Sequence, residues 1–348
     1  MIRVGIVGLG FMGWVHWLSY QKLRGARVAA ICSRDPRKRA GDWRDVRGNF
    51  GPRGEKVELN GAIAYAELDE LLADPKIDLV DICLPPALHA DAAVRSLRAG
   101  KHVLCEKPMA LTLPDCQRMA AAAQKAKRQL CVGHVLPYFP EYDWALSTVR
   151  SGKYGKLRGG SFRRVIAEPK WLQNYWSSEH VGGPMLDLHV HDAHFIRLLF
   201  GQPTAVSTAG RIRNGLAEFW HSQFRFRNRD IVVETTSGTI NQQGRPFNHG
   251  FEIHLEKATL AFEFAVIGSA GSYLCVPTLL DSKGRVVRPK MPDGDPMNAF
   301  PLELREVLRA VNEDKPSEIL GANLAQDAIR ICEAESASLT SGRPVDLK

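Results

Sequence analysis

The sequence predicts an α/β protein, with a doubly wound parallel sheet in its N-terminal part and a second α/β domain after it. Three observations support this class. Short apolar runs alternate with helical stretches through residues 1–130, a glycine-rich turn joins the first run to the first helix, and longer runs of alternating polarity follow from residue 204. Because 348 residues exceed one typical core, we expect two domains, 1–130 and 131–348.

The first βαβ unit gives the clearest local signal. The apolar run Ile2–Val7 predicts a buried parallel strand, and the motif GLGFMG follows at residues 8–13. A helical stretch begins near Trp14, and a second strand is expected at residues 27–32. A GxGxxG motif alone is weak evidence, but a strand, turn, helix and strand in this order are typical of a dinucleotide-binding Rossmann unit.

Each glycine of the turn has a physical role in that interpretation. Gly8 permits the tight turn, Gly10 lets a pyrophosphate approach the backbone, and Gly13 lets the helix pack closely on the strand. The free N–H groups and the dipole of the helix N-terminus favour phosphates. The cofactor contacts predicted here are Gly8, Gly10, Phe11, Met12 and Gly13. A glycine-rich turn without a ligand is the alternative.

The end of the second strand indicates which dinucleotide is bound. NAD enzymes usually carry an acidic residue there, which holds the ribose 2′-hydroxyl. This chain has Ser33 and Arg34 instead, with Arg37 and Lys38 following. Without a carboxylate to repel it, a 2′-phosphate finds a bidentate partner in Arg34. NADP is therefore favoured over NAD, and the alternative is that Arg34 stacks on adenine while Ser33 serves NAD.

Regular alternation continues through the rest of the first domain. Gly100 ends one helix, and the last strand of the series leads into Glu106-Lys107-Pro108. The elements expected here are a loop insertion at 41–61, helices at 65–73 and 90–99, and strands at 79–84 and 102–105.

The second half of the chain has a strand-rich pattern. Glycine and polar turns separate runs of alternating polarity, which predict strands at 218–226, 231–240, 250–255 and 259–266. Amphipathic helices are expected at 300–312 and 322–339, and we expect the last helix to return to the first domain.

Composition and charge exclude several classes of protein. No run of eighteen apolar residues occurs, and the chain enters a strand at once, so we expect neither a membrane span nor a signal peptide. Seven scattered cysteines without a CxxC pair indicate reduced thiols in a cytoplasmic protein. The net charge of +8 comes from dispersed basic residues, which favours a basic pocket for an anionic cofactor or substrate over nucleic-acid binding.

Four segments carry a family resemblance from end to end: VGIVGLGFMG, LPPALHADAAVRSLRAGKHVLCEKP, GGPMLDLHVHDAHFIRLLFG and IRICEAESASLTSGRPVDL. In these segments the chain resembles the glucose-fructose oxidoreductase/inositol dehydrogenase (Gfo/Idh/MocA) family. The resemblance implies a Rossmann domain and a C-terminal α/β domain with a large, mostly antiparallel sheet. It also implies a nicotinamide cofactor, hydride transfer to or from a sugar, cyclitol or related polyol, and a homo-oligomer (dimer or tetramer) assembled through the C-terminal sheets.

The third segment contains three histidines and two aspartates within an apolar helical pattern. On a continuous helix over 186–199, Asp187, His191 and His194 fall within a stripe about 60° wide. His189 and Asp192 point away from it. Because the two rings of the HxH pair then diverge by about 200°, we predict no metal site. Core histidines satisfied by backbone carbonyls are the structural alternative.

The resemblance assigns the catalytic groups. Asp187 and His191 have the spacing of the family's catalytic pair, and Lys107 matches its catalytic lysine, with a cis peptide expected before Pro108. An imidazole is a suitable base for removing a hydroxyl proton, Asp187 can orient it, and Lys107 can donate a hydrogen bond to the reacting oxygen. Whether Lys107 or His191 is the immediate base stays open.

Further site residues are expected around these groups. Aromatic faces in the loop before the catalytic helix can pack against a sugar, or can instead fill the groove between the domains. The additional cofactor contacts are Pro85, His89, Glu106 and Lys107, and the substrate candidates are His134, Trp171, Trp176 and His194. A glycosidase that uses transient oxidation by NAD, and a non-catalytic dinucleotide sensor, are the alternative functions. The sequence does not identify the substrate or the reaction direction.

Overall fold

The computed structural model describes all residues except 171, 173, 293 and 348. The chain forms two compact units, which we call the nucleotide unit (residues 1–139 and 294–326) and the sheet unit (residues 140–293 and 327–348). Within the described residues, no helix has the length and apolar character that crossing a membrane requires.

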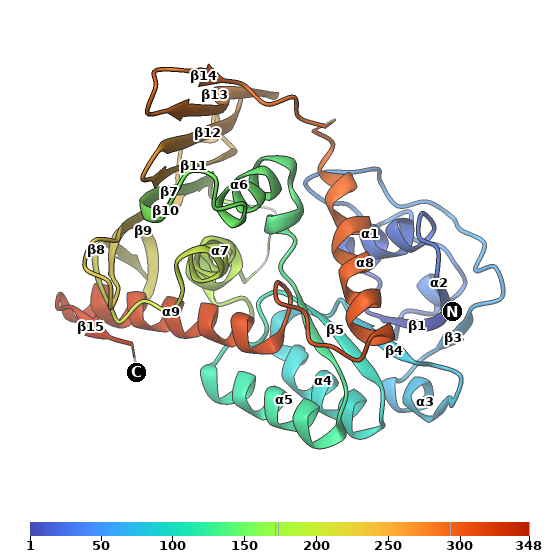
Figure 1. Ribbon diagram of the computed structural model, residues 1–348. Coiled ribbons are helices and arrows are strands. Elements are labelled where there is room, and N and C mark those ends of the chain that lie inside the picture. The colour runs from blue at the N-terminus through green and yellow to red at the C-terminus, as the bar shows by residue number, and fades with distance from the viewer. Residues whose placement is uncertain (171, 173, 293, 348) are drawn as a thin grey trace. The chain divides into compact units, whose positions relative to one another are not determined.

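The nucleotide unit is built on a parallel six-stranded sheet in the order β3-β2-β1-β4-β5-β6. Helices α1 and α8 pack together on one face, and α4 and α5 on the other (Figure 1). The strands are β1 (Ile2–Val7), β2 (Ala26–Cys32), β3 (Ile63–Tyr65), β4 (Leu79–Ile82), β5 (His102–Glu106) and β6 (Leu130–Gly133). The helices are α1 (Phe11–Tyr20), α2 (Pro36–Arg39), α3 (Leu68–Ala73), α4 (His89–Arg98), α5 (Leu113–Ala126) and α8 (Ala299–Asn312), with 3₁₀ turns at Pro86–Leu88, Leu136–Tyr138 and Pro296–Asn298.

This topology confirms the doubly wound parallel sheet. The strand order reverses between β1 and β4, and such a switch point opens a crevice at the carboxyl ends of the strands. The strands are short and almost wholly buried because both faces of the sheet are covered by helices.

The expected loop insertion at 41–61 contributes to the core of this unit. Trp43 is fully buried, and its ring meets Trp14 and Trp17 of α1 edge-on, with centroids 5.7 and 5.0 Å away. Indole N–H groups fix the loop: Trp43 donates to Lys38 O (2.7 Å) and Trp14 donates to Pro52 O (2.9 Å). The segment is irregular in backbone but packed as core, because its aromatic residues cover α1.

The sheet unit contains a nine-stranded sheet in the order β14-β13-β12-β11-β7-β10-β9-β8-β15. All its neighbouring strands pair antiparallel except β7 and β10, which confirms the large, mostly antiparallel sheet. The strands are β7 (Leu157–Ala167), β8 (Ala205–Arg213), β9 (Leu216–Arg225), β10 (Val232–Ile240), β11 (Phe247–Leu255), β12 (Ala258–Ile267), β13 (Ala270–Asp281), β14 (Val286–Val287) and β15 (Val345–Asp346).

Three helices lie against one side of this sheet (Figure 1): α6 (Pro140–Arg150), α7 (Val190–Phe200) and α9 (Ala322–Ser341). Only the first residues of α9, up to Gln326, cluster with the nucleotide unit, and the rest belongs to the sheet unit. There Ser338 accepts a hydrogen bond from the backbone N–H of Thr208 at 2.9 Å. The last helix therefore returns to the nucleotide unit only at its N-terminal end.

Candidate active site

In the nucleotide unit, the predicted cofactor residues gather at the carboxyl edge of the parallel sheet. The glycine turn follows β1, Ser33 and Arg34 follow β2, Pro85 follows β4, and Lys107 follows β5. Parallel strands bring the loops at their carboxyl ends to one edge, which is where ligands bind in open α/β sheets. The fold thus brings together segments that are up to about a hundred residues apart in the sequence.

The glycine turn leaves open space at one position only. Gly8 has a φ of 95°, and a Cβ there would lie 2.6 Å from the carbonyl oxygen of Cys83. A Cβ on Gly13 would lie 2.1 Å from the carbonyl oxygen of Gly8, whereas a Cβ on Gly10 would meet no atom within 4 Å. Gly8 and Gly13 are therefore needed for packing, and the exposed Gly10, at the N-terminus of α1, is where a pyrophosphate fits.

The side chains that follow Gly10 serve the packing of the unit. The ring of Phe11 meets Phe50 edge-on at 4.8 Å, and Met12 packs against the buried cluster around Phe300. Their backbone N–H groups open the first turn of α1, and these are the groups that the predicted phosphate contacts require.

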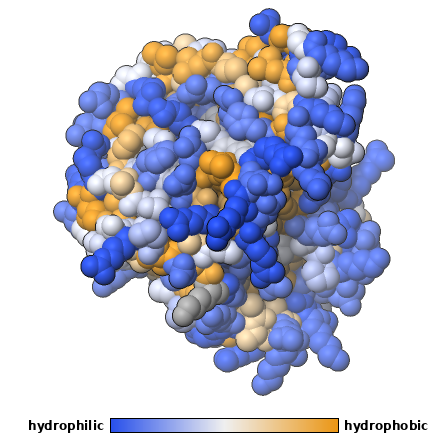
Figure 2. Space-filling view, turned by 60° about the vertical axis from the view of Figure 1, so that its left-hand side comes forward, coloured by the Kyte–Doolittle hydropathy of each residue, from blue (hydrophilic) through white to orange (hydrophobic). Residues whose placement is uncertain are grey.

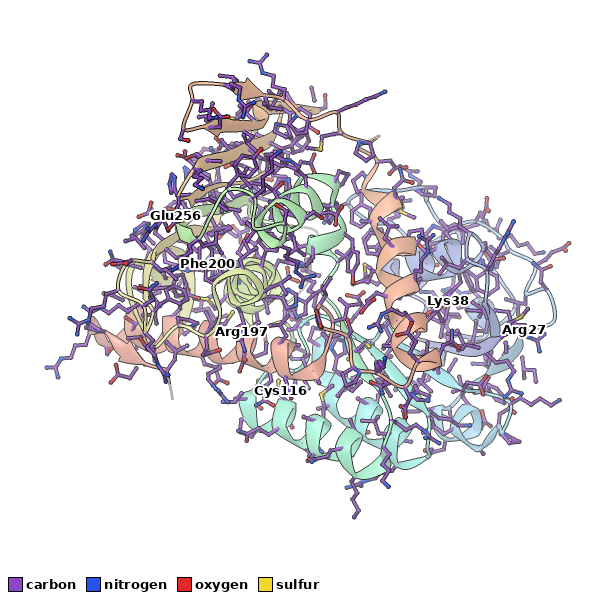
Figure 3. All side chains as sticks on the ribbon, in the orientation of Figure 1. Arg27, Lys38, Cys116, Arg197, Phe200 and Glu256 are labelled. Atoms are coloured by element: carbon purple, nitrogen blue, oxygen red, sulfur yellow. The ribbon has the colours of Figure 1, made fainter. Side chains whose placement is uncertain are left out.

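The basic residues after β2 have different surroundings. Arg37 pairs with Asp35 at 3.0 Å, and Lys38, labelled in Figure 3, donates from Nζ to the carbonyl oxygen of Leu9 at 2.9 Å. Arg34 is exposed, and its guanidinium makes no hydrogen bond or ion pair within the described part of the chain. Arg34 is thus the basic side chain of this loop that remains available to an anionic group.

The loop after β5 is held on both sides of Lys107. The peptide between Lys107 and Pro108 is cis, as expected. The backbone N–H of Lys107 donates to Glu106 Oε2 at 3.1 Å. His89 is fully buried, and its ring nitrogens lie 2.8 Å from Pro108 O and 2.7 Å from Leu84 O. Burial lowers the pKa of His89 despite these two carbonyls. The His89 ring connects the loops after β4 and β5. It therefore supports the loops that carry other predicted cofactor contacts.

His134, a substrate candidate, follows β6 at the same edge of the sheet. Its side chain is 1% exposed, and its backbone N–H donates to Val132 O at 2.7 Å. Trp171, another candidate, lies outside the described residues. The role of both residues in substrate binding stays a prediction.

The segment before α7 differs from the continuous helix that the sequence predicts. Met185–His189 forms a π-helical turn, and α7 begins only at Val190. A π turn has more residues than an α turn, so a wheel at 100° per residue does not hold at Asp187. Asp187 and His191 are both partly exposed, whereas His194 is fully buried. Of the three residues expected on one accessible stripe, Asp187 and His191 are therefore accessible and His194 is not. The burial of His194 argues against its predicted contact with the substrate.

His189 has a structural place in the sheet unit. Its Nδ1 lies 2.8 Å from Ser237 Oγ, its Nε2 lies 2.9 Å from Glu335 Oε2, and the ring meets Trp220 edge-on. Burial disfavours a charged ring, but the carboxylate of Glu335 outweighs it and raises the pKa of His189. This ring connects α9 and β10 to the turn that carries Asp187.

A buried ion pair fixes the next residue of the segment. Arg164 Nε and Nη2 donate to Asp192 at 2.6 and 3.1 Å, and both side chains are at most 5% exposed. The Arg164 guanidinium is thus used inside the unit, where it holds α7 on β7.

A pocket of about 350 Å³ lies in the loop before the π turn and is lined by Tyr175 and Trp176, among others. Trp176 donates from Nε1 to Glu168 at 2.7 Å, and Arg213 lies over its ring at 4.5 Å. Burial, and after it the charge of Asp187, raise the pKa of Tyr175, which places this wall of the pocket within electrostatic reach of Asp187. The predicted candidate Trp176 is thus held at this pocket by Glu168 and Arg213.

Two groups of described residues have enough close ligand atoms for a metal ion: His16 with Asp81 and Cys83, and His16 with Glu106 and Glu303. Neither group includes a histidine of the segment 182–201. The sequence interpretation missed His16 and Glu303. A usable signal for His16 was its position between Val15 and Trp17 in an apolar helix, the same pattern that drew attention to segment 182–201.

Comparisons with known proteins match both units. Residues 2–134 match an oxidoreductase family with the NAD-binding Rossmann fold, and residues 142–261 match the GFO/IDH/MocA C-terminal domain. An uncharacterized oxidoreductase of Rhizobium meliloti is 33% identical over 204 residues, 58% of this chain and 56% of that protein. Inositol 2-dehydrogenase 2 of Saccharopolyspora erythraea is 30% identical over 243 residues, 69% and 65% respectively. The chain thus spans less than two thirds of the length of these relatives.

A solved structure extends the match over the full length. Levoglucosan dehydrogenase in complex with NADH superposes with a TM-score of 0.80 over 100% of this chain and 99% of that chain, at 19% identity. That similarity shows the fold, and the two family matches cover the glycine turn, the Lys107 loop and the segment of Asp187 and His191. The chain belongs to the Gfo/Idh/MocA oxidoreductase family.

Proposed function

We propose that the protein is an NAD(P)-dependent oxidoreductase that transfers a hydride between the cofactor and a hydroxyl or carbonyl carbon of a sugar, cyclitol or related polyol. One observation carries the proposal: the open Gly10 cradle and the doubly anchored Lys107 lie at the same edge of the parallel sheet. The NADH held by levoglucosan dehydrogenase and the inositol named for the second relative support the cofactor and substrate classes.

The cofactor fits the residues present. The backbone at Gly10 and the first turn of α1 would hold the pyrophosphate, since a side chain at Gly10 would fill that space. The nicotinamide, when bound, supplies the acceptor or donor of the hydride. Arg34 would pair with a 2′-phosphate, so we propose a preference for NADP over NAD.

The proposed chemistry at the substrate needs groups from both units. Lys107 of the nucleotide unit donates a hydrogen bond to the reacting oxygen and stabilises the negative charge that develops there. His191 of the sheet unit takes or returns the hydroxyl proton, and Asp187 orients the imidazole and stabilises its positive charge.

The pocket beside Asp187 suits a polyol. Glu168 and Lys170 offer polar groups, and the Trp176 ring, fixed by Glu168 and Arg213, offers a flat face for sugar C–H surfaces. We propose that one end of the substrate lies in this pocket.

We also propose a homo-oligomer formed through the sheet unit, in the cytoplasm. Apolar side chains remain exposed on β12, β13 and β14, at one end of the sheet. Hydrophobic (orange) surface is visible at the top of Figure 2, at the height at which Figure 1 shows β13 and β14. The exposed side chains are Ile267, Tyr273, Leu274, Val276, Leu280, Val286 and Val287. A patch of this kind marks a protein contact. Cys32, Cys83, Cys105, Cys131, Cys275 and Cys332 form no disulfide, which fits a reducing compartment.

The experiment is a cofactor titration followed by a substrate screen. Calorimetry should show binding of NAD(H) or NADP(H), and a sugar, cyclitol or sugar acid should change the absorbance of the reduced cofactor. The variant Lys107→Met should keep cofactor binding and lose most turnover, with Lys101→Met, a lysine bonded to backbone carbonyls elsewhere in the unit, as control. Absence of cofactor binding would refute the proposal. Glycoside turnover without net cofactor change would replace it by the glycosidase reaction.

A further inference from the structure

A cluster of buried titratable groups lies beneath the Lys107 loop in the nucleotide unit. It is formed by His16 of α1, Asp81 of β4, Glu106 of β5 and Glu303 of α8. Glu106 is 5% exposed and the other three side chains are fully buried. Buried carboxyls are costly unless they are paired or protonated, and the proposed chemistry uses none of these four groups directly.

His16 stands between two carboxylates. Its Nδ1 lies 2.9 Å from Asp81 Oδ2, and its Nε2 lies 3.1 Å from Glu106 Oε1. The Nδ1 contact is a hydrogen bond, whereas the Nε2 contact lacks hydrogen-bond geometry and is attractive only if the ring carries a positive charge. Burial opposes that charge, but the charge of Asp81 outweighs it and raises the pKa of His16. The raised pKa favours the imidazolium form, whose single charge offsets one of the two carboxylate neighbours.

Glu303 is the carboxyl of the cluster that has no hydrogen-bond partner among the described residues. Within the described residues, neither of its side-chain oxygens has a hydrogen-bond donor. One of these oxygens lies within 4.8 Å of both a ring nitrogen of His16 and a Glu106 oxygen. Burial, and after it the charge of Glu106, raise the pKa of Glu303 well above its ordinary value. Two buried carboxyls at this separation with one cation between them are stable when they hold one proton.

Glu106 connects this cluster to the active-site loop. Its Oε2 accepts the backbone N–H of Lys107 at 3.1 Å, while Oε1 faces His16. Space for this carboxylate exists because residue 133 is glycine: a Cβ there would lie 2.8 Å from Glu106 Oε1. The direction of the Glu106 carboxylate thus decides where the backbone of Lys107 is held.

We propose that Glu303 is a positioning residue for Lys107: it shares one proton with Glu106, and this proton and the His16 imidazolium fix the carboxylate that holds the Lys107 backbone. The inference rests on the proposed role of Lys107. A divalent cation held by His16, Glu106 and Glu303 is the competing occupant, and the experiment distinguishes the two. The other titratable groups around the cluster are Tyr20, Cys83, Cys105, Cys131 and Tyr138.

The proton itself can be observed without any assay of activity. At a pH about four units above the ordinary carboxyl pKa, the infrared spectrum of the wild-type protein should still show the C=O band of a protonated carboxyl. The band should be absent from Glu303→Gln. No such band in the wild-type protein, or a stoichiometric divalent metal in elemental analysis of the purified protein, would overturn the inference.

The positioning role is tested by kinetics of matched variants. Glu303→Gln keeps a neutral donor in place and should retain kcat within about threefold, whereas Glu303→Leu should lower kcat by up to about a hundredfold, because small displacements of a reacting group are that costly. KM and the cofactor Kd should stay nearly constant. Glu141→Gln, a buried carboxyl bonded to Tyr273 in the sheet unit, is the control and should keep kcat.

The two failures are distinguishable. If Lys107→Met is inactive but folded Glu303→Leu turns over like the wild type, the positioning role is wrong and the proposed function stands. If Lys107→Met is fully active, the proposed function is wrong, whatever the infrared band shows. If Glu303→Leu does not fold, the infrared band and the retained kcat of Glu303→Gln still decide.

Discussion

Each unit of this protein buries one histidine against acidic residues, and the two clusters differ in composition. In the sheet unit, His189 contacts one carboxylate, Glu335, and one hydroxyl, Ser237. In the nucleotide unit, His16 contacts two carboxylates, Asp81 and Glu106, with the third carboxyl of Glu303 close by. Because a hydroxyl can either donate or accept a hydrogen bond, Ser237 is a suitable partner for His189 Nδ1 whether or not that nitrogen carries a proton.

Carboxylates only accept hydrogen bonds, so the His16 cluster must bind protons to be stable. The comparison therefore separates two uses of a buried histidine. His189 joins the π turn, β10 and α9 and supports the fold, whereas His16 and its neighbours place charge beneath a loop that carries a catalytic candidate. The variants below should separate these uses.

The largest effect is expected at His191. His191→Ala should lower kcat by about 10²–10⁴, the usual contribution of general acid–base catalysis, with little change in the free energy of unfolding because the side chain is partly exposed. His189→Ala leaves Glu335 buried without its partner and should cost about 1–3 kcal/mol of stability, with a smaller loss of kcat. Denaturant unfolding and steady-state kinetics measure both. A larger kcat loss for His189→Ala would show that the active segment is misassigned.

The next effect concerns the buried pair that holds α7. Asp192→Asn leaves the Arg164 guanidinium buried and unpaired and should cost about 3–5 kcal/mol in the free energy of unfolding. The matched control is Asp78→Asn in the nucleotide unit, where the Arg3 pair is about one third exposed and should contribute much less. Equal losses in urea unfolding would mean that Arg164 finds another partner.

The difference between these elements also explains what the sequence could predict. The glycine turn, β1, β4 and the Lys107 loop are continuous segments whose glycines and apolar runs specify them locally, so they were predicted. The π turn at Met185–His189 was not, because no local pattern distinguishes it from an α turn. The His16 cluster joins residues 16, 81, 106 and 303, and only the folded chain brings Glu303 of α8 to the other three.

The free energy of unfolding should depend on pH for different reasons below and above pH 6.5, the ordinary pKa of histidine. Burial, and after it Arg164, lower the pKa of His249 well below 6.5, so below pH 6.5 the unfolded chain binds a proton that the folded one does not, and stability falls on acidification. His16 and His189 have raised pKa values, so the stability they contribute is lost as pH rises above 6.5. His249→Phe should flatten the acidic side alone in thermal unfolding. An unchanged acidic side would assign that dependence to other groups.

The smallest effect is expected at the cofactor. Arg34→Ala should weaken NADP binding by about tenfold or more, the contribution of one charge-assisted hydrogen bond, and should leave NAD binding nearly unchanged. Arg37→Ala is the control, because Arg37 is already paired with Asp35. Calorimetry that gave equal weakening of NAD and NADP would mean that Arg34 stacks on adenine.

The central claim is that Lys107 and His191 act on the same reacting hydroxyl, Lys107 on its oxygen and His191 on its proton, and a double-mutant cycle tests it directly. Lys107→Met and His191→Ala should each lower kcat/KM by about 10²–10⁴, and the double variant should lose little more, because groups that act as a unit are not additive. The cofactor Kd of His191→Ala should match that of the wild type. If the two losses multiplied in the double variant, the residues would act independently, and their proposed joint action would be contradicted.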